Sequence, residues 1–246
     1  LRIPRGGDGA DAPEVPPAPV AIDYWLGADA ASGVTLEILD AAGEVVATQQ
    51  SGNDRAAGER DEQEMRGPPS RGRSPDALGT TAGLNRFWWD FRADIEGERS
   101  GPLLPPGNYT ARLTVGDWTG EQSFDVLIDP RVAADGVTIA DLREQYDFNR
   151  KVLALQADAR ALLEQVQQAR ENAQGSRATE LDAILARLTE RRDQSYPQPM
   201  LVQQISYLSG MTSSADQKVG RDAFQRYDEL MAWLAREQEA FGGAGG

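Results

Sequence analysis

The chain of 246 residues carries 39 Asp and Glu side chains against 25 Lys and Arg, a formal net charge of −14. This acidic balance argues against nucleic acid or an anionic membrane surface as partner. The chain has no Cys and no His, which excludes disulfides, His-based or thiolate catalysis, and zinc or haem sites built on these residues. These absences remove most catalytic mechanisms but leave carboxylate catalysis open, and we expect no catalysis by this chain and no cofactor. No apolar run approaches the 18 or so residues that would span a bilayer, so we expect no membrane insertion.

Residues 1–19 are rich in Gly and Pro and show no hydrophobic period, so they predict an extended lead-in or linker. They contain neither a basic n-region nor an apolar h-region, and we expect the chain to be a mature product or a fragment.

Apolar and polar residues alternate after residue 20, and this period of two predicts β-strands. The first two runs place one set of apolar residues on a single face: Ile22, Tyr24, Leu26, Val34, Leu36 and Ile38. Gly43 supplies a turn before a return strand at 44–47, which predicts a β-hairpin. Residues 49–83 are rich in Gly, Pro and charge, and they predict a long, mobile loop.

Strand patterns resume at 84–92, with Phe87, Trp89 and Phe91 on one face. Strict alternation from Tyr109 to Val115 predicts the next strand, and a hairpin turn at 116–120 leads into another that reaches Ile128. We expect six or seven short strands, arranged as an immunoglobulin- or fibronectin-like antiparallel β-sandwich over residues 20–132.

Helical patterns fill residues 133–242. Thr138 and Asp141 have the spacing of a capping box, and a seam of apolar residues spaced by three and four follows, from Phe148 to Ala173, with Gly175 expected to end this helix. Further amphipathic segments lie at 181–188, 200–211 and 224–241, the last with Met231 on its seam. The whole chain is predicted to be α+β, the sandwich being followed by an antiparallel bundle of three to four helices and a flexible tail at 243–246.

Two sets of side chains are candidate sites. Trp25, Trp88 and Trp118 could stack on the apolar face of a sugar ring, although a helical bundle packed on the sheet is the simpler explanation for Trp88. Asp94, Glu96 and Glu98 form an acidic loop that is a weak calcium candidate. Their spacing matches no glycosidase pattern, so we assign no catalytic residue.

Several motifs in order resemble one family: Pro16-Pro17 before VAIDY, VTLEILDAAGEVV, GLNRFWWDFR, GPLLPPGNYTARLTV, DPRV at Asp129, and SYLSGM followed by Ala215-Asp216-Gln217. Together they are similar to the C-terminal region of large secreted bacterial proteins with an N-terminal BNR-repeat, sortilin-like β-propeller, often labelled glycosyl hydrolase. The resemblance implies an extracellular, periplasmic or cell-surface setting. No Asp-box motif of the propeller occurs in this chain, so no catalytic residue of the family carries over.

The sequence therefore predicts a non-catalytic accessory or assembly module of an exported bacterial protein, which contacts its parent propeller or other protein subunits. A carbohydrate-binding module with a glycan as partner is one alternative, and a fragment of a secreted glycoside hydrolase is another. Oligomeric state, the identity of the partner and the role of the 49–83 loop stay open.

Overall fold

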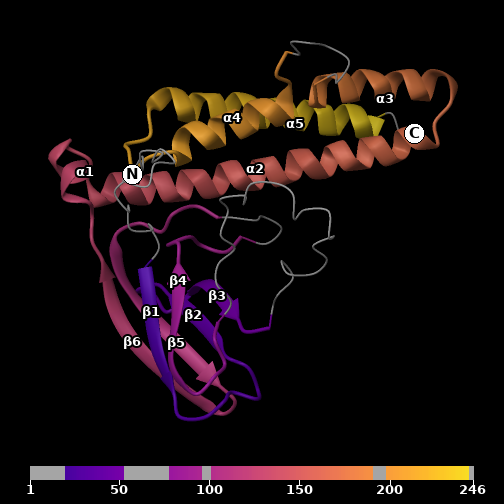
Figure 1. Ribbon diagram of the computed structural model, residues 1–246. Coiled ribbons are helices and arrows are strands. Elements are labelled where there is room, and N and C mark those ends of the chain that lie inside the picture. The colour runs from indigo at the N-terminus through magenta and orange to yellow at the C-terminus, as the bar shows by residue number, and fades with distance from the viewer. Residues whose placement is uncertain (1–19, 53–77, 96–100, 191–197, 244–246) are drawn as a thin grey trace, which may run out of the picture. The chain divides into compact units, whose positions relative to one another are not determined.

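The computed structural model describes residues 20–52, 78–95, 101–190 and 198–243. Within these ranges the protein is mixed α+β, with two antiparallel sheets and five helices (Figure 1). The chain divides into two compact units, one holding the strands and the other the helices. The predicted lead-in 1–19 and most of the predicted 49–83 loop lie outside the described residues.

The strands are β1 (Val20–Leu26), β2 (Thr35–Leu39), β3 (Val45–Gln50), β4 (Gly83–Trp89), β5 (Gly107–Val115) and β6 (Trp118–Val126). β1 and β4 form a two-stranded sheet, and the other four form a second sheet in the order β3-β2-β5-β6. Every pairing is antiparallel. The predicted β2–β3 hairpin is confirmed: Gly43 takes a φ of 82°, and Asp40 Oδ1 accepts the backbone N–H groups of Ala42 and Glu44.

The period of two in the sequence sorts each strand into a buried and an outward face. In the two-stranded sheet the buried side chains include Tyr24, Phe87 and Trp89, and in the larger sheet they include Leu36 and Ile38. Trp89 of β4 meets Phe124 of β6 edge to face, with ring centroids 6.2 Å apart. The core of this unit therefore draws on both sheets.

The predicted strand ends are wrong at two places. β4 ends at Trp89 rather than Arg92, because Phe91 takes a φ of 60° that breaks the extended backbone, and its carbonyl accepts the N–H of Leu104. β6 ends at Val126 rather than Ile128. β3 ends at Gln50 and β4 begins at Gly83, so both ends of the predicted 49–83 loop belong to strands.

The helices are α1 (Pro130–Ala134), α2 (Ile139–Glu171), α3 (Gly175–Leu188), α4 (Leu201–Ser213) and α5 (Arg221–Gly243). The predicted capping box is confirmed at the start of α2, where Thr138 and Asp141 each accept the other's backbone N–H. α1 was not predicted; it starts after Asp129, whose side chain accepts the N–H of Arg131. None of the helices in the described ranges is long and apolar enough to cross a membrane.

Helices α2 to α5 share one apolar core, and α3, α4 and α5 all contact α2 (Figure 1). The predicted apolar seam of α2 supplies fully buried side chains to this core, among them Phe148, Val152 and Val166. Two predictions are wrong in detail. Gly175 begins α3 instead of ending α2, and Met231 is 47% exposed while the adjacent Leu230 is fully buried.

Candidate functional site

The outward face of the two-stranded sheet holds two of the three predicted tryptophans. In the β1–β4 register, Trp25 lies opposite Leu84 and Trp88 lies opposite Ala21, with Asp23 opposite Arg86 between them. Because side chains alternate along a strand, all of these residues point away from the buried Tyr24 and Phe87. We call this surface the aromatic face; its members are Ala21, Asp23, Trp25, Leu84, Arg86 and Trp88.

One end of the aromatic face is an exposed apolar pair. Trp25 is 72% exposed and Leu84 is 67% exposed, and they lie directly across from each other on paired strands. A single exposed apolar side chain is ordinary on a protein surface, whereas adjacent large ones mark an interaction site more often. The pair is therefore the most apolar part of the face.

The centre of the aromatic face is an ion pair joined by two hydrogen bonds. Arg86 donates through Nε and Nη2 to the two carboxylate oxygens of Asp23, at 2.7 and 2.8 Å. The hydrogen bonds from Arg86 hold the pKa of the Asp23 carboxyl below its ordinary value, and the carboxylate raises the pKa of Arg86 in turn. The guanidinium also lies over the Trp88 ring, 5.5 Å from its centroid. These contacts place the guanidinium between the Asp23 carboxylate and the Trp88 ring.

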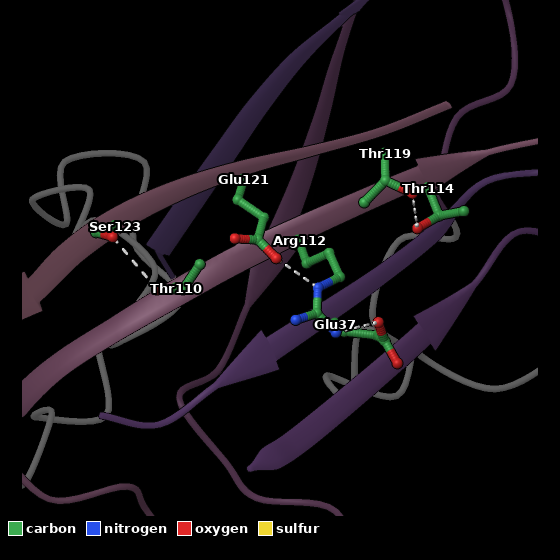
Figure 2. Close-up of polar contacts among 7 residues, drawn as sticks. All are labelled: Glu37, Thr110, Arg112, Thr114, Thr119, Glu121 and Ser123. Carbon is green, nitrogen blue, oxygen red and sulfur yellow. Dashed lines mark hydrogen bonds and ion pairs between the residues drawn. The ribbon is translucent and has the colours of Figure 1, made fainter. Parts of the chain in front are cut away.

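The four-stranded sheet presents a different outward surface, shown in Figure 2. Arg112 on β5 donates to Glu121 on β6 at 2.7 Å and lies 3.5 Å from Glu37 on β2. Two hydroxyl pairs, Thr110 with Ser123 and Thr114 with Thr119, lie on either side of Arg112, and the two oxygens of each pair are 3.3 Å apart. We call this surface the polar face; its members are Glu37, Thr110, Arg112, Thr114, Thr119, Glu121 and Ser123.

The structure does not bring Trp118 together with Trp25 and Trp88. It opens β6 in the four-stranded sheet, opposite Val115, and it is 57% exposed. Its ring lies over Gly120, where an added Cβ would clash with the indole. The ring therefore packs on the backbone of Gly120 in its own strand, in the space that a side chain at this position would fill.

Asp94 is tied to the backbone of a neighbouring strand. Its N–H donates to the carbonyl of Val46, and its carboxylate accepts the N–H of Thr48, so it covers part of the outer edge of β3. Burial raises the pKa of Asp94 while the Thr48 N–H opposes that shift. The other two calcium candidates, Glu96 and Glu98, lie outside the described residues. Across the described ranges, no three acidic side chains gather into a group that could hold a metal ion.

The aromatic face can bind but offers no obvious chemistry. Its charged groups are an Asp and an Arg that pair with each other, and its remaining side chains provide apolar contact, ring stacking and the indole N–H donors of the two tryptophans. Sequence reasoning found Trp25 and Trp88 but missed Leu84 and the Asp23–Arg86 pair. The signal that would have found them is the register between β1 and β4, which are far apart in the chain.

Comparison of the chain with protein families, curated proteins and solved structures finds no match in any of the three.

Proposed function

We propose that this protein is a non-catalytic accessory or assembly module that binds another protein through its aromatic face. The observation that carries the proposal is the exposed Trp25–Leu84 pair beside the Arg86–Asp23 ion pair. Aromatic side chains and Arg are enriched at protein interfaces. The parent β-propeller or another subunit of an exported bacterial assembly is the proposed partner, and the motif resemblance is the support for that extracellular or periplasmic setting.

The finer architecture is part of the same proposal. We infer an immunoglobulin- or fibronectin-like β-sandwich, supported by two antiparallel sheets whose buried faces meet at Trp89 and Phe124. We also infer an antiparallel helical bundle, supported by the single apolar core that α2 to α5 share. In this arrangement the aromatic face is a sheet surface that lies outside the core of the sandwich.

Site-specific photo-crosslinking tests the proposed partner class. A benzophenone amino acid is placed at Leu84 on the aromatic face and, as the matched control, at Thr110 on the polar face, and each chain is expressed in its native cell. We expect a discrete crosslinked protein band from the Leu84 position and none from Thr110. Equal crosslinking from both positions, or none from either, contradicts the proposal.

Carbohydrate binding is the second candidate, favoured by the presence of Trp25 and Trp88 on one face. Flat rings flanking a hydrogen-bonding pair are a suitable platform for a sugar chain. However, the Arg86 guanidinium already covers the Trp88 ring, which leaves Trp25 as the open ring.

Titration of intrinsic tryptophan fluorescence with an oligosaccharide panel separates the two candidates. A saturable change that is lost in Trp25→Ala supports glycan binding. A diffuse, carbohydrate-sized smear from the Leu84 crosslink would agree with it. Turnover of any glycan in the same panel would contradict the non-catalytic assignment altogether.

A further inference from the structure

Strand β6 is an open edge of the four-stranded sheet (Figure 1). It stands last in the strand order β3-β2-β5-β6 and is nine residues long. At the opposite edge, Asp94 covers the backbone of β3 through Val46 and Thr48. In the described part of the chain, no residue outside β5 and β6 hydrogen-bonds to the β6 backbone. A long, uncovered edge strand is a template for pairing with another strand.

The backbone groups that β6 turns outward belong to every second residue. The hairpin loop between β5 and β6 has two residues, so it closes on a hydrogen-bonded pair, Val115 with Trp118. From there on, hydrogen-bonded and non-hydrogen-bonded pairs alternate. The residues whose N–H and C=O groups point away from β5 are therefore Thr119, Glu121, Ser123 and Asp125. In agreement with this, the Ser123 carbonyl accepts the Gln122 side chain at 3.0 Å.

Two β6 strands can pair antiparallel about a twofold axis, and the acidic side chains decide where that axis lies. An axis at Glu121 places this side chain opposite its own copy, and an axis at Ser123 places Glu121 opposite Asp125. Like charges directly opposite each other destabilise a strand pair. An axis at Gln122 avoids both arrangements and pairs all nine residues of the strand. It places Glu121 opposite Ser123, and Asp125 opposite Thr119.

The same register brings apolar side chains together on the other side of the strand. It places Trp118 opposite Val126 of the second copy, and Gly120 opposite Phe124. Trp118 is 57% exposed in the single chain, and its ring lies over Gly120. An aromatic side chain opposite a β-branched one is a favourable cross-strand pair. The most exposed apolar side chain of β6 is therefore covered by the register that the charges select.

We propose that two copies of the chain pair through β6, antiparallel and with the twofold axis at Gln122, so that their four-stranded sheets become one continuous sheet. A single edge contact covers little area, and interfaces of that size are weak. The net charge of −14 on each chain opposes the association further, so salt should strengthen the dimer. The pairing uses the edge of the sheet and does not depend on the function proposed for the aromatic face.

A single introduced cysteine tests the register, because the chain has no Cys of its own. In Gln122→Cys the two thiols lie directly opposite each other at the axis, where the separation of the strands suits a disulfide. In Thr119→Cys, the control on the same strand, the two thiols lie toward opposite ends of the interface. Under mild oxidation we expect a disulfide dimer from Gln122→Cys and little from Thr119→Cys. Equal yields, or no dimer from either variant, overturn the proposal.

Sedimentation equilibrium over a range of concentrations measures the dimer without a crosslink. Ser123→Lys places a base opposite Glu121 and should tighten the dissociation constant about fivefold, because the axis makes each pair twice. Ser123→Glu should weaken it by a similar factor. Thr110→Lys and Thr110→Glu are the matched controls, since Thr110 lies beside Ser123 on β5, one strand away from the edge (Figure 2).

Two results of the sedimentation experiment contradict the pairing. A wild-type chain that stays monomeric at millimolar concentration in physiological salt overturns the proposal and leaves the β6 edge to a strand of another protein. Equal shifts in the Ser123 and Thr110 variants would make net charge, rather than the register at β6, the cause of any change, and they overturn it as well.

Discussion

The two sheets of the β unit turn very different surfaces outward. On the four-stranded sheet, Arg112 joins Glu37 and Glu121 across three strands, and the neighbouring hydroxyls pair with each other. On the two-stranded sheet, a tryptophan and a leucine face each other in solvent beside a single ion pair. The polar face satisfies its own hydrogen bonds, whereas the aromatic face leaves apolar area uncovered.

This difference separates a surface that stability alone explains from one that it does not. A polar, self-satisfied sheet surface is the ordinary way for an antiparallel sheet to meet water. Large exposed apolar side chains add little to folding, because folding does not remove them from water. The aromatic face is therefore the surface whose composition needs an explanation beyond stability.

The largest expected effect comes from the opposite side of β4. Trp89 is 3% exposed and packs on Phe124, so Trp89→Ala should lower the free energy of unfolding by about 3–5 kcal/mol. Trp25→Ala on the aromatic face should change it by less than about 0.5 kcal/mol. Urea unfolding measures both. If the two variants lower the free energy of unfolding equally, Trp25 is part of the folding core and the division between the surfaces is wrong.

A smaller effect is expected on the polar face. Arg112 is partly exposed and bridges two carboxylates, and surface pairs of this kind contribute up to about 1 kcal/mol. Arg112→Gln should therefore destabilise the chain by about that amount or less, and high salt should shrink the difference between the variant and the wild-type chain. Urea unfolding at low and high sodium chloride checks this, with Thr114→Ala as the uncharged control whose effect on stability should not depend on salt. A salt-independent loss would contradict the surface ion-pair account.

The smallest effect is a pH dependence at Asp23. Because Arg86 lowers the pKa of Asp23 from its ordinary value of 3.8, the contribution of this pair to stability is present at neutral pH and is lost as the pH falls below that value. In Arg86→Gln the Asp23 pKa should return toward 3.8, and the stability difference from wild type should vanish in acid. Carboxyl NMR titration measures the pKa, and an unchanged value in the variant would rule out the pair as its cause.

The sequence predicted elements whose signals are local. The Gly43 turn, the Thr138–Asp141 capping box and the alternation through Tyr109 each depend on neighbours within a few residues. The predicted strand end at Arg92 was wrong because of Phe91, which takes a positive φ that is uncommon for Phe. A long-range hydrogen bond from the Leu104 N–H to the Phe91 carbonyl accompanies this conformation. Element ends are set by such tertiary contacts, which a period cannot reveal.

The candidate site was predicted only in part for the same reason. Alternation alone put Trp25 and Trp88 opposite the core. Their common surface with Leu84 and the Asp23–Arg86 pair depends on the register of two strands that are distant in the sequence. The role of Asp94 was also hidden, since its partners Val46 and Thr48 lie on a distant strand.

Hydroxyl-radical footprinting tests whether a partner covers the aromatic face, and it works whether or not that partner has been identified. Oxidation of Trp25 and Trp118 is compared between the purified chain, in which both are more than half exposed, and the chain in its native cell. We expect Trp25 to become protected in the cell while Trp118 does not. Equal oxidation of Trp25 in the two settings would contradict the assignment of the aromatic face as a binding surface.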